Sequence, residues 1–162
     1  MRAERFSEDD LQRVQVLGLC RFSYPAELNG FQTRHKTMNE RRAYLYSTKR
    51  LEESLFLFEH LLLPGIENQS NDDFTLMLLL GDDFPGLYRE RLLALLADVP
   101  QVKPVFRASG PHRLVYRDLF LEERDPRANV VAEFRLDDDD AVAVNYVQTI
   151  RRLLPKLRPL FS

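Results

Sequence analysis

Apolar segments of strand length alternate with segments of helical periodicity along this chain, and that alternation restricts the fold more than any other feature. Alternating strands and helices predict a parallel sheet whose two faces are covered by helices. Right-handed crossover connections leave only a few topologies for such a sheet. The four predicted strands are residues 14–19, 74–80, 102–106 and 130–136.

A helical segment follows each predicted strand. Residues 21–50, which precede the first of these helices, are rich in polar and aromatic types and are predicted to form a long loop with no more than one helical turn. Pro64 and Gly65 are expected to end the first helix, and Pro155 is expected to kink or shorten the last one. The predicted helices are residues 51–63, 88–99, 111–123 and 147–157.

The chain of 162 residues is long enough to bury a core within one domain. We therefore predict a single α/β domain over residues 1–162, with three layers and a mostly parallel, Rossmann-like sheet. Pro104 favours an edge position for the third strand, and the continuous apolar run 74–80 favours a strand covered on both faces. If the strand order is 3-2-1-4, the loops after the first, second and fourth strands converge where such sheets bind their ligands.

Charge and composition exclude several classes of protein. The chain has 23 basic and 25 acidic residues and a formal net charge of −2, which argues against a general nucleic-acid binder. Its single cysteine, Cys20, cannot form an intrachain disulfide and is expected to be a small buried hydrophobe. The apolar runs are too short to cross a bilayer, and the first residues do not resemble a secretory leader. These features predict a cytoplasmic protein, either free or peripheral at a membrane through the basic, leucine-containing segment 151–161.

Two acidic clusters follow two of the predicted strands. Asp82 and Asp83 come after the second strand, and residues 137–140, four consecutive aspartates, come after the fourth. Adjacent carboxylates repel each other unless a cation or protons intervene, and hard divalent ions prefer carboxylate oxygens. The pattern predicts a phosphate-bearing substrate held through a metal in the crevice that the two loops share. The ordinary alternative is a solvated acidic loop.

Several segments in order resemble one family of enzymes. The motif at 135–140 is similar to the strand and Asp-x-Asp motif of GT-A glycosyltransferases, and 51–80 is similar to their first helix and second strand. More narrowly, nearly the whole chain resembles the rhamnosyltransferase family. The segments that carry this narrower resemblance are 18–23 (GLCRFS), 41–45 (RRAYL) and 88–92 (YRERL).

The resemblance implies a GT-A fold that binds a nucleotide-diphospho-sugar donor and transfers the sugar to a saccharide or another hydroxyl acceptor. It implies that Asp137 lies near the ribose or base and that Asp138 belongs to the same substrate-binding segment. It also implies that Asp82 or Asp83 contacts the nucleoside and that Arg21 faces the donor pocket.

The same resemblance implies a metal cofactor, Mg²⁺ or Mn²⁺. Asp139 would bind the ion that holds the donor diphosphate, with Asp140 in support. In the enzymes that the chain resembles, the catalytic base and acceptor site come from the region after this motif, and here only 22 residues follow Asp140. The catalytic base is therefore unassigned. The chain is expected to be the donor-binding half of an enzyme, truncated after the helix that follows the motif and exposing apolar surface that favours self-association.

Two other functions remain open from the sequence. One is a truncated, non-catalytic domain that binds nucleotides or another protein. The other is a Mg²⁺-dependent phosphohydrolase with Asp137 as nucleophile and Asp139 as acid. That chemistry usually places its acidic motif after the first strand rather than the last, so it ranks below glycosyl transfer.

Overall fold

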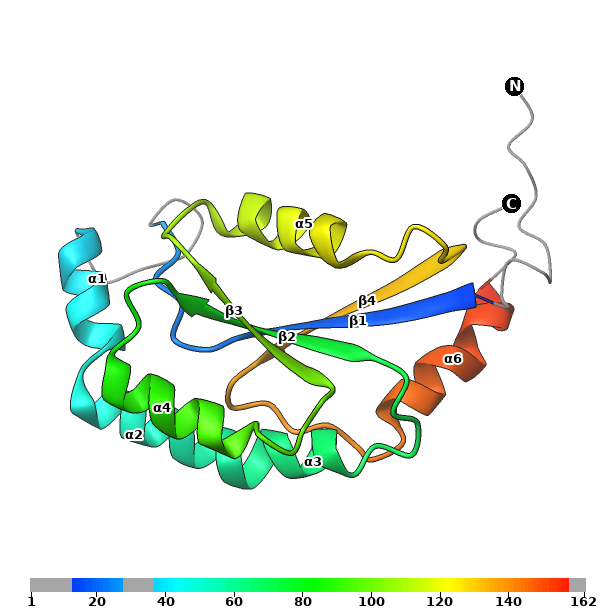
Figure 1. Cartoon of the computed structure of the whole chain (residues 1–162), viewed down its shortest axis with the longest axis horizontal. Helices are drawn as coiled ribbons and strands as arrows, with labels where there is room; N and C mark the ends of the chain where they lie inside the picture. The colour runs from blue at the N-terminus through cyan, green and yellow to red at the C-terminus, as the bar shows by residue number, and fades with distance from the viewer. Residues whose placement is uncertain (1–12, 28–36, 158–162) are drawn as a thin grey trace.

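A computed structural model describes residues 13–27 and 37–157 of the chain. Strands and helices alternate in it as the sequence predicts, and a single π-helical turn interrupts the helical segment between the first two strands (Figure 1). In chain order the elements are β1 (Val14–Arg21), α1 (Met38–Leu45), α2 (Thr48–Leu57), η2 (Phe58–Leu62), α3 (Leu63–Glu67), β2 (Thr75–Gly81), α4 (Gly86–Leu95), β3 (Val102–Arg107), α5 (His112–Glu123), β4 (Val130–Asp137) and α6 (Tyr146–Leu157).

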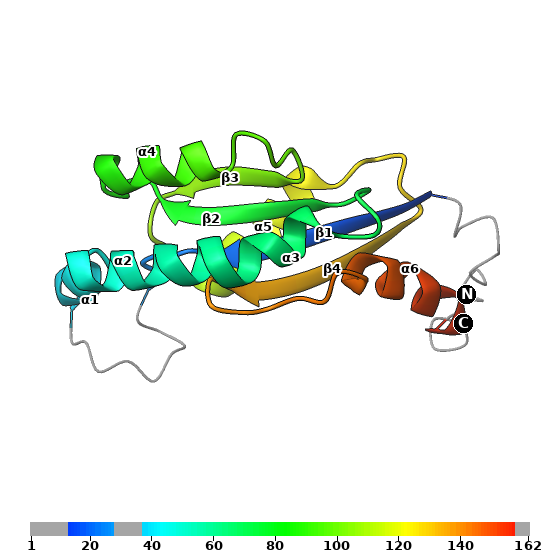
Figure 2. The ribbon, with the colours of Figure 1, turned by 90° about the horizontal axis from the view of Figure 1, so that it is seen from below.

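All strand pairs are parallel, and the strand order is β3-β2-β1-β4, the order under which the loops after the first, second and fourth strands were expected to converge. The order is visible in Figure 2, where β3 and β4 form the two edges. Helix α5 covers one face of the sheet, and α2, α3 and α4 cover the other (Figure 1). The predicted α/β class with three Rossmann-like layers is therefore confirmed, and Pro104 lies in an edge strand as expected.

Each face of the sheet has its own apolar core, because successive side chains of a strand point to opposite faces. On β1, Val16 and Cys20 face the α2–α4 side, whereas Leu17 and Leu19 face α5. All four are at most 2% exposed. Strand β1 is thus covered on both faces, and Cys20 is the buried hydrophobe that was predicted.

The prediction of a long loop over 21–50 is wrong for the described part of that range. Helix α1 lies within it, and α2 begins at Thr48. Both helices have a side-chain N-cap: the Thr37 hydroxyl accepts from the backbone N–H of Glu40 at 3.2 Å, and Ser47 accepts from that of Arg50 at 3.4 Å. Such caps are readable in a sequence. Residues 28–36 lie outside the described part of the chain.

Pro64 and Gly65 do not end the first long helix, which was the second wrong prediction. The π turn η2 leads directly into α3, and Pro64 occupies the first turn of α3, where a missing N–H is tolerated. Gly65 has a different role, because a Cβ there would lie 2.6 Å from the carbonyl oxygen of Val142. Glycine therefore allows the chain after β4 to pass close to α3.

Helix α6 includes Pro155 and ends at Leu157, so the proline lies near its C-terminal end.

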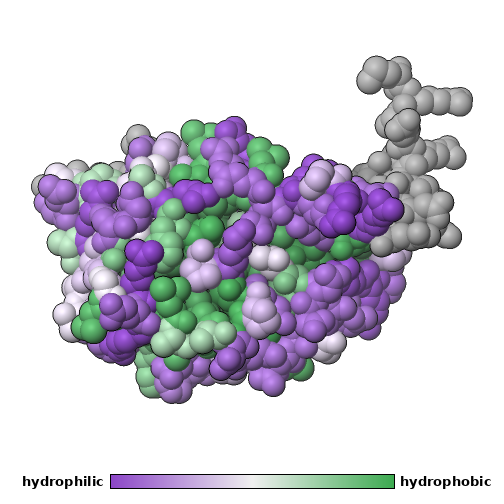
Figure 3. All heavy atoms as spheres, in the orientation of Figure 1, coloured by the Kyte–Doolittle hydropathy of each residue, from purple (hydrophilic) through white to green (hydrophobic). Residues whose placement is uncertain are grey.

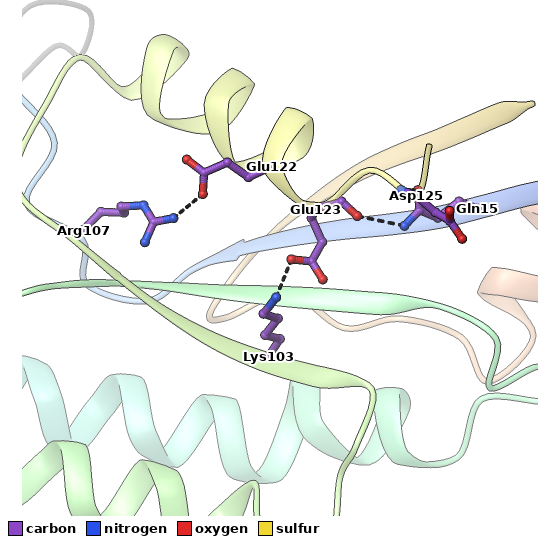
Figure 4. A network of polar contacts seen from close by, with 6 residues as sticks. All are labelled: Gln15, Lys103, Arg107, Glu122, Glu123 and Asp125. Atoms are coloured by element: carbon purple, nitrogen blue, oxygen red, sulfur yellow. Dashed lines mark hydrogen bonds and ion pairs between the residues drawn. The ribbon is translucent and has the colours of Figure 1, made fainter. Parts of the chain in front are cut away.

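Polar contacts hold the C-terminal part of α5 over the sheet (Figure 4). Glu122 accepts from Arg107 and Glu123 from Lys103, both at 2.5 Å, so α5 is tied to β3 at two points. The Gln15 amide donates to the Glu123 carbonyl at 3.0 Å and accepts from the Asp125 N–H at 2.9 Å. Exposed ion pairs stabilise little individually, but these contacts fix how α5 lies on the sheet.

The surface carries apolar side chains as well as charged ones. Seen from the β3 side, apolar residues gather in the middle of the molecule and polar residues surround them (Figure 3). Leu87, Leu114 and Leu121 are 67%, 47% and 60% exposed.

Among the described residues, no helix combines the length and the apolar character needed to cross a bilayer. The last residues of the basic segment 151–161, from 158 onward, lie outside the described part.

Gly18 allows a close contact across the core that a larger residue would break. A Cβ at position 18 would lie 2.4 Å from Cζ of Phe134 and 2.7 Å from Cδ1 of Leu76. We predict that Gly18→Ala lowers the free energy of unfolding by about 1–3 kcal/mol, the usual cost of overpacking a core. Urea unfolding measures this effect. In the matched control, Gly86→Ala, the new Cβ meets no described atom within 4 Å, so stability should be unchanged or slightly higher. Equal effects of the two substitutions would contradict the prediction.

Candidate functional site

The carboxyl ends of β1 and β4 bring two predicted site residues together. Arg21 and Asp137 are register partners in the parallel pair β1–β4. The Arg21 Nη2 atom lies 2.8 Å from Asp137 Oδ1, with side chains 28% and 53% exposed. An ion pair this exposed contributes at most about 1 kcal/mol to stability. The pair matters because of where it lies: parallel sheets of this kind bind their ligands outside the carboxyl ends of the strands.

A cleft of about 280 Å³ lies where these two strand ends meet the first turn of α5. Of the predicted site residues, Arg21, Asp137 and Asp140 line it; Asp82, Asp83, Asp138 and Asp139 are not among the described residues that do so. The full lining is Leu19, Arg21, His112, Tyr116, Arg135, Leu136, Asp137 and Asp140.

The four consecutive aspartates do not face one point. The carboxylate of Asp140 turns back and accepts from the backbone N–H of Asp137 at 2.7 Å. Asp138 is only 5% exposed, and Asp139 is exposed. Within 13–27 and 37–157, no three or more His, Cys, Asp or Glu side chains are grouped to hold a metal ion.

Asp138 faces α2 rather than the cleft. Burial raises the pKa of its carboxyl, and the nearby Ser54 side chain and Arg50 charge offset only part of that effect. Its Oδ2 atom has no hydrogen-bond partner among the described residues. The pKa is raised because a buried carboxylate with incomplete hydrogen bonding favours its neutral form.

Asp83 is bound within the fold. Arg42 Nε of α1 lies 2.8 Å from its Oδ2 atom, and the Tyr46 hydroxyl donates to Oδ1 at 2.7 Å. Burial, and then the bond to Asp83, raise the pKa of Tyr46. Arg42 also donates to Ser109 Oγ at 2.8 Å, so α1 joins the loops after β2 and β3. Asp82, the other predicted residue of this pair, is exposed.

A larger cleft, of about 640 Å³, lies at the other end of the sheet, beside the first residues of β1 and β2. Four of the charged residues that line it form two ion pairs, Asp73 with Arg151 at 2.6 Å and Asp125 with Arg127 at 2.9 Å. The smaller cleft is the better candidate site, because it lies at the carboxyl ends of the strands.

The sequence matches the family described as "Putative rhamnosyl transferase" over residues 15–162. The chain belongs to this family. No curated protein matches the chain. The match confirms the resemblance drawn from the sequence and, by the family's description, points to glycosyl transfer.

Besides two leucines, three polar residues that line the cleft of this rhamnosyl transferase family member were not predicted as site residues: His112, Tyr116 and Arg135. A signal for Arg135 was present, because strand alternation places it on the same face as Asp137. Tyr116 is buried, and burial raises its pKa more than the Arg21 charge lowers it. The two α5 residues carry no local signal, since their place follows from how α5 lies on the sheet.

The loop after β1 has an unusual backbone conformation beside the site. Ser23 has a φ of 46°, in the left-handed region that non-glycine residues seldom adopt. It is 7% exposed, and its Oγ atom has no hydrogen-bond partner among the described residues. Such local strain often occurs near functional sites, and here it lies two residues after Arg21.

We predict that Asp138→Asn makes the protein more stable at pH 7. The pKa of Asp138 is raised in the folded state, so its favourable contribution is present at low pH and is lost as pH rises through the folded pKa. An amide of the same shape removes that loss. Urea unfolding from pH 4 to pH 8 should show a gain over the original chain that grows with pH. The exposed neighbour provides the control, because Asp139→Asn should change stability by less than about 0.5 kcal/mol. A pH-independent or destabilising effect of Asp138→Asn would contradict this account.

Proposed function

We propose that this chain binds a nucleoside-diphosphate sugar at the carboxyl edge of its sheet and serves transfer of the sugar to a hydroxyl acceptor. Membership of the rhamnosyl transferase family supports the reaction class. The observation that carries the proposal is the cleft between β1, β4 and α5, because charged side chains meet there at the end of the sheet that binds ligands. Its volume of about 280 Å³ suits a diphosphate and a part of the groups attached to it.

The residues present fit a divalent ion that is shared with the substrate rather than one held by the protein alone. Mg²⁺ is commonly bound through one or two carboxylates together with substrate phosphates and water. Asp140 lines the cleft, and Asp139 is exposed next to it. These two carboxylates would hold Mg²⁺ or Mn²⁺, which when bound stabilises negative charge on the departing diphosphate.

Contacts within the fold also suggest roles for the other predicted site residues. Asp83 is already bound by Arg42 and Tyr46, so we assign the nucleoside contact of this pair to Asp82. Arg21 borders the cleft and is suited to a phosphate oxygen, because a guanidinium donates to such oxygens from a fixed fork. Asp137 orients Arg21 through their ion pair.

Asp139→Ala tests the shared-metal arrangement. We predict that the substitution weakens binding of a nucleoside diphosphate in the presence of Mn²⁺ by about tenfold or more, because it removes a charged ligand. Calorimetry measures the affinity. Mn²⁺ titrated without nucleotide should bind weakly to either protein, since the diphosphate supplies part of the ligand set. Asp98→Ala, at an exposed aspartate before β3, should leave the affinity unchanged. Equal affinity of the Asp139 variant would support a solvated acidic loop instead.

A further inference from the structure

We propose that the cleft contains an anion site, formed by Arg21, Arg135 and His112, that holds a diphosphate directly and does not require a divalent metal. The inference rests on the proposed function in taking the donor diphosphate as the ligand. It goes beyond that function, in which only Arg21 contacts a phosphate oxygen, because it adds Arg135 of β4 and His112 of α5 and makes the site independent of a metal.

The three side chains come from three elements that meet at one place. In the β1–β4 register, Leu19 is the partner of Arg135 and Arg21 is the partner of Asp137, so both arginines lie on the face that α5 covers. His112 is the first residue of α5. All three proposed anion ligands line the same cleft.

Tyr116 lies between Arg135 and His112 and contacts both. The Arg135 guanidinium carbon lies 5.2 Å from the centre of the Tyr116 ring, within the range of a cation–π contact. The His112 ring centre lies 5.8 Å from that of Tyr116, in an edge-to-face arrangement. Because Tyr116 is only 6% exposed, it supports both side chains from a fixed position.

Two arginines and two aspartates line the cleft; Arg21 is paired with Asp137, whereas Arg135 lies over the Tyr116 ring. Burial lowers the pKa of His112, and the guanidinium groups of Arg113, Arg21, Arg135 and Arg41 lower it further. Of these four arginines, Arg21 and Arg135 line the cleft with His112, together with the carboxylates of Asp137 and Asp140. An anion in the cleft would interact favourably with both guanidinium groups and would favour the protonated form of His112.

The orientation of α5 adds to this effect. The N-terminus of a helix favours anions, because its first N–H groups lack partners within the helix and its dipole is positive there. The N-cap residue, Pro111, has no polar side chain with which to cap those groups. The contacts of Glu122 and Glu123 with β3 hold the other end of the helix on the sheet, so its first turn stays at the cleft (Figure 4).

The Arg21–Asp137 ion pair leads to a second expectation, a substitution that strengthens anion binding instead of weakening it. At 2.8 Å, the Asp137 carboxylate occupies a position on the guanidinium that a phosphate oxygen would also take. An incoming diphosphate must compete with this carboxylate and is repelled by its charge. Removing the Asp137 charge should therefore tighten binding of an anion, whereas removing a cation should weaken it.

The test is calorimetry of the full chain with inorganic pyrophosphate, at low salt and in the presence of a chelator. We expect saturable binding that weakens by about tenfold or more in Arg135→Gln and tightens in Asp137→Asn. Arg127→Gln removes an exposed arginine from the other end of the sheet and should leave the affinity unchanged. Thermal unfolding of each variant checks that the fold is retained. Absence of binding to the original chain, or equal affinity in the Arg135 variant, would overturn the proposal.

A parallel titration with a nucleoside diphosphate and Mn²⁺ separates this proposal from the proposed function. If pyrophosphate fails to bind without metal but the nucleotide binds with Mn²⁺ and depends on Asp139, the anion site is wrong and the proposed function stands. If pyrophosphate binds through Arg135 but neither nucleoside diphosphate nor nucleotide sugar binds under any condition, the anion site stands and the proposed function fails.

Discussion

Strand β1 pairs with β2 on one side and with β4 on the other, and both of its faces are buried. Because all three strands are parallel, their carboxyl ends lie at one edge of the sheet. The register then decides which side chains meet: Arg21 is the last residue of β1 and lies opposite Asp137, the last residue of β4. A shift of one residue would turn Arg21 away from α5 and separate the pair. The candidate site therefore depends on the packing of β1.

Successive side chains of a strand alternate between its two faces, which explains why the four consecutive aspartates are not grouped around one point. Asp137 lies on the α5 side with Arg21, and Asp138, the next residue, faces Ser54 and Arg50 on the α2 side. Consecutive residues at a strand end point in opposite directions, so neighbouring carboxylates of such a run cannot all face one ion. Asp139 and Asp140 lie in the turn beyond the strand, and they are the two carboxylates to which we assign the proposed shared ion.

Elements whose formation is dictated by apolar burial could be predicted from the sequence, and elements held by polar contacts could not. The four strands followed from apolar runs, and topology rules left only a few possible orders for them. Helix α1 was missed because it has little apolar character; ion pairing of Arg42 with Asp83 joins it to the loop after β2. At the site, Arg21 and Asp137 were predicted to share a pocket. His112 was not, because its place depends on the tertiary position of α5.

At the carboxyl edge of the sheet, the charged side chains are arranged differently on the α1 side and on the α5 side. On the α1 side, Arg42, Asp83 and Tyr46 satisfy one another, and a Cβ at Gly81 would lie 2.2 Å from the Tyr46 hydroxyl, so this side is closely packed. On the α5 side, Arg21 is paired with Asp137, whereas Arg135 lies over the Tyr116 ring and borders the cleft. Charges that pair within the fold hold it together, whereas a charge that borders a cleft can attract a ligand of the opposite sign. The proposed anion site therefore lies on the α5 side, where Arg135 borders the cleft.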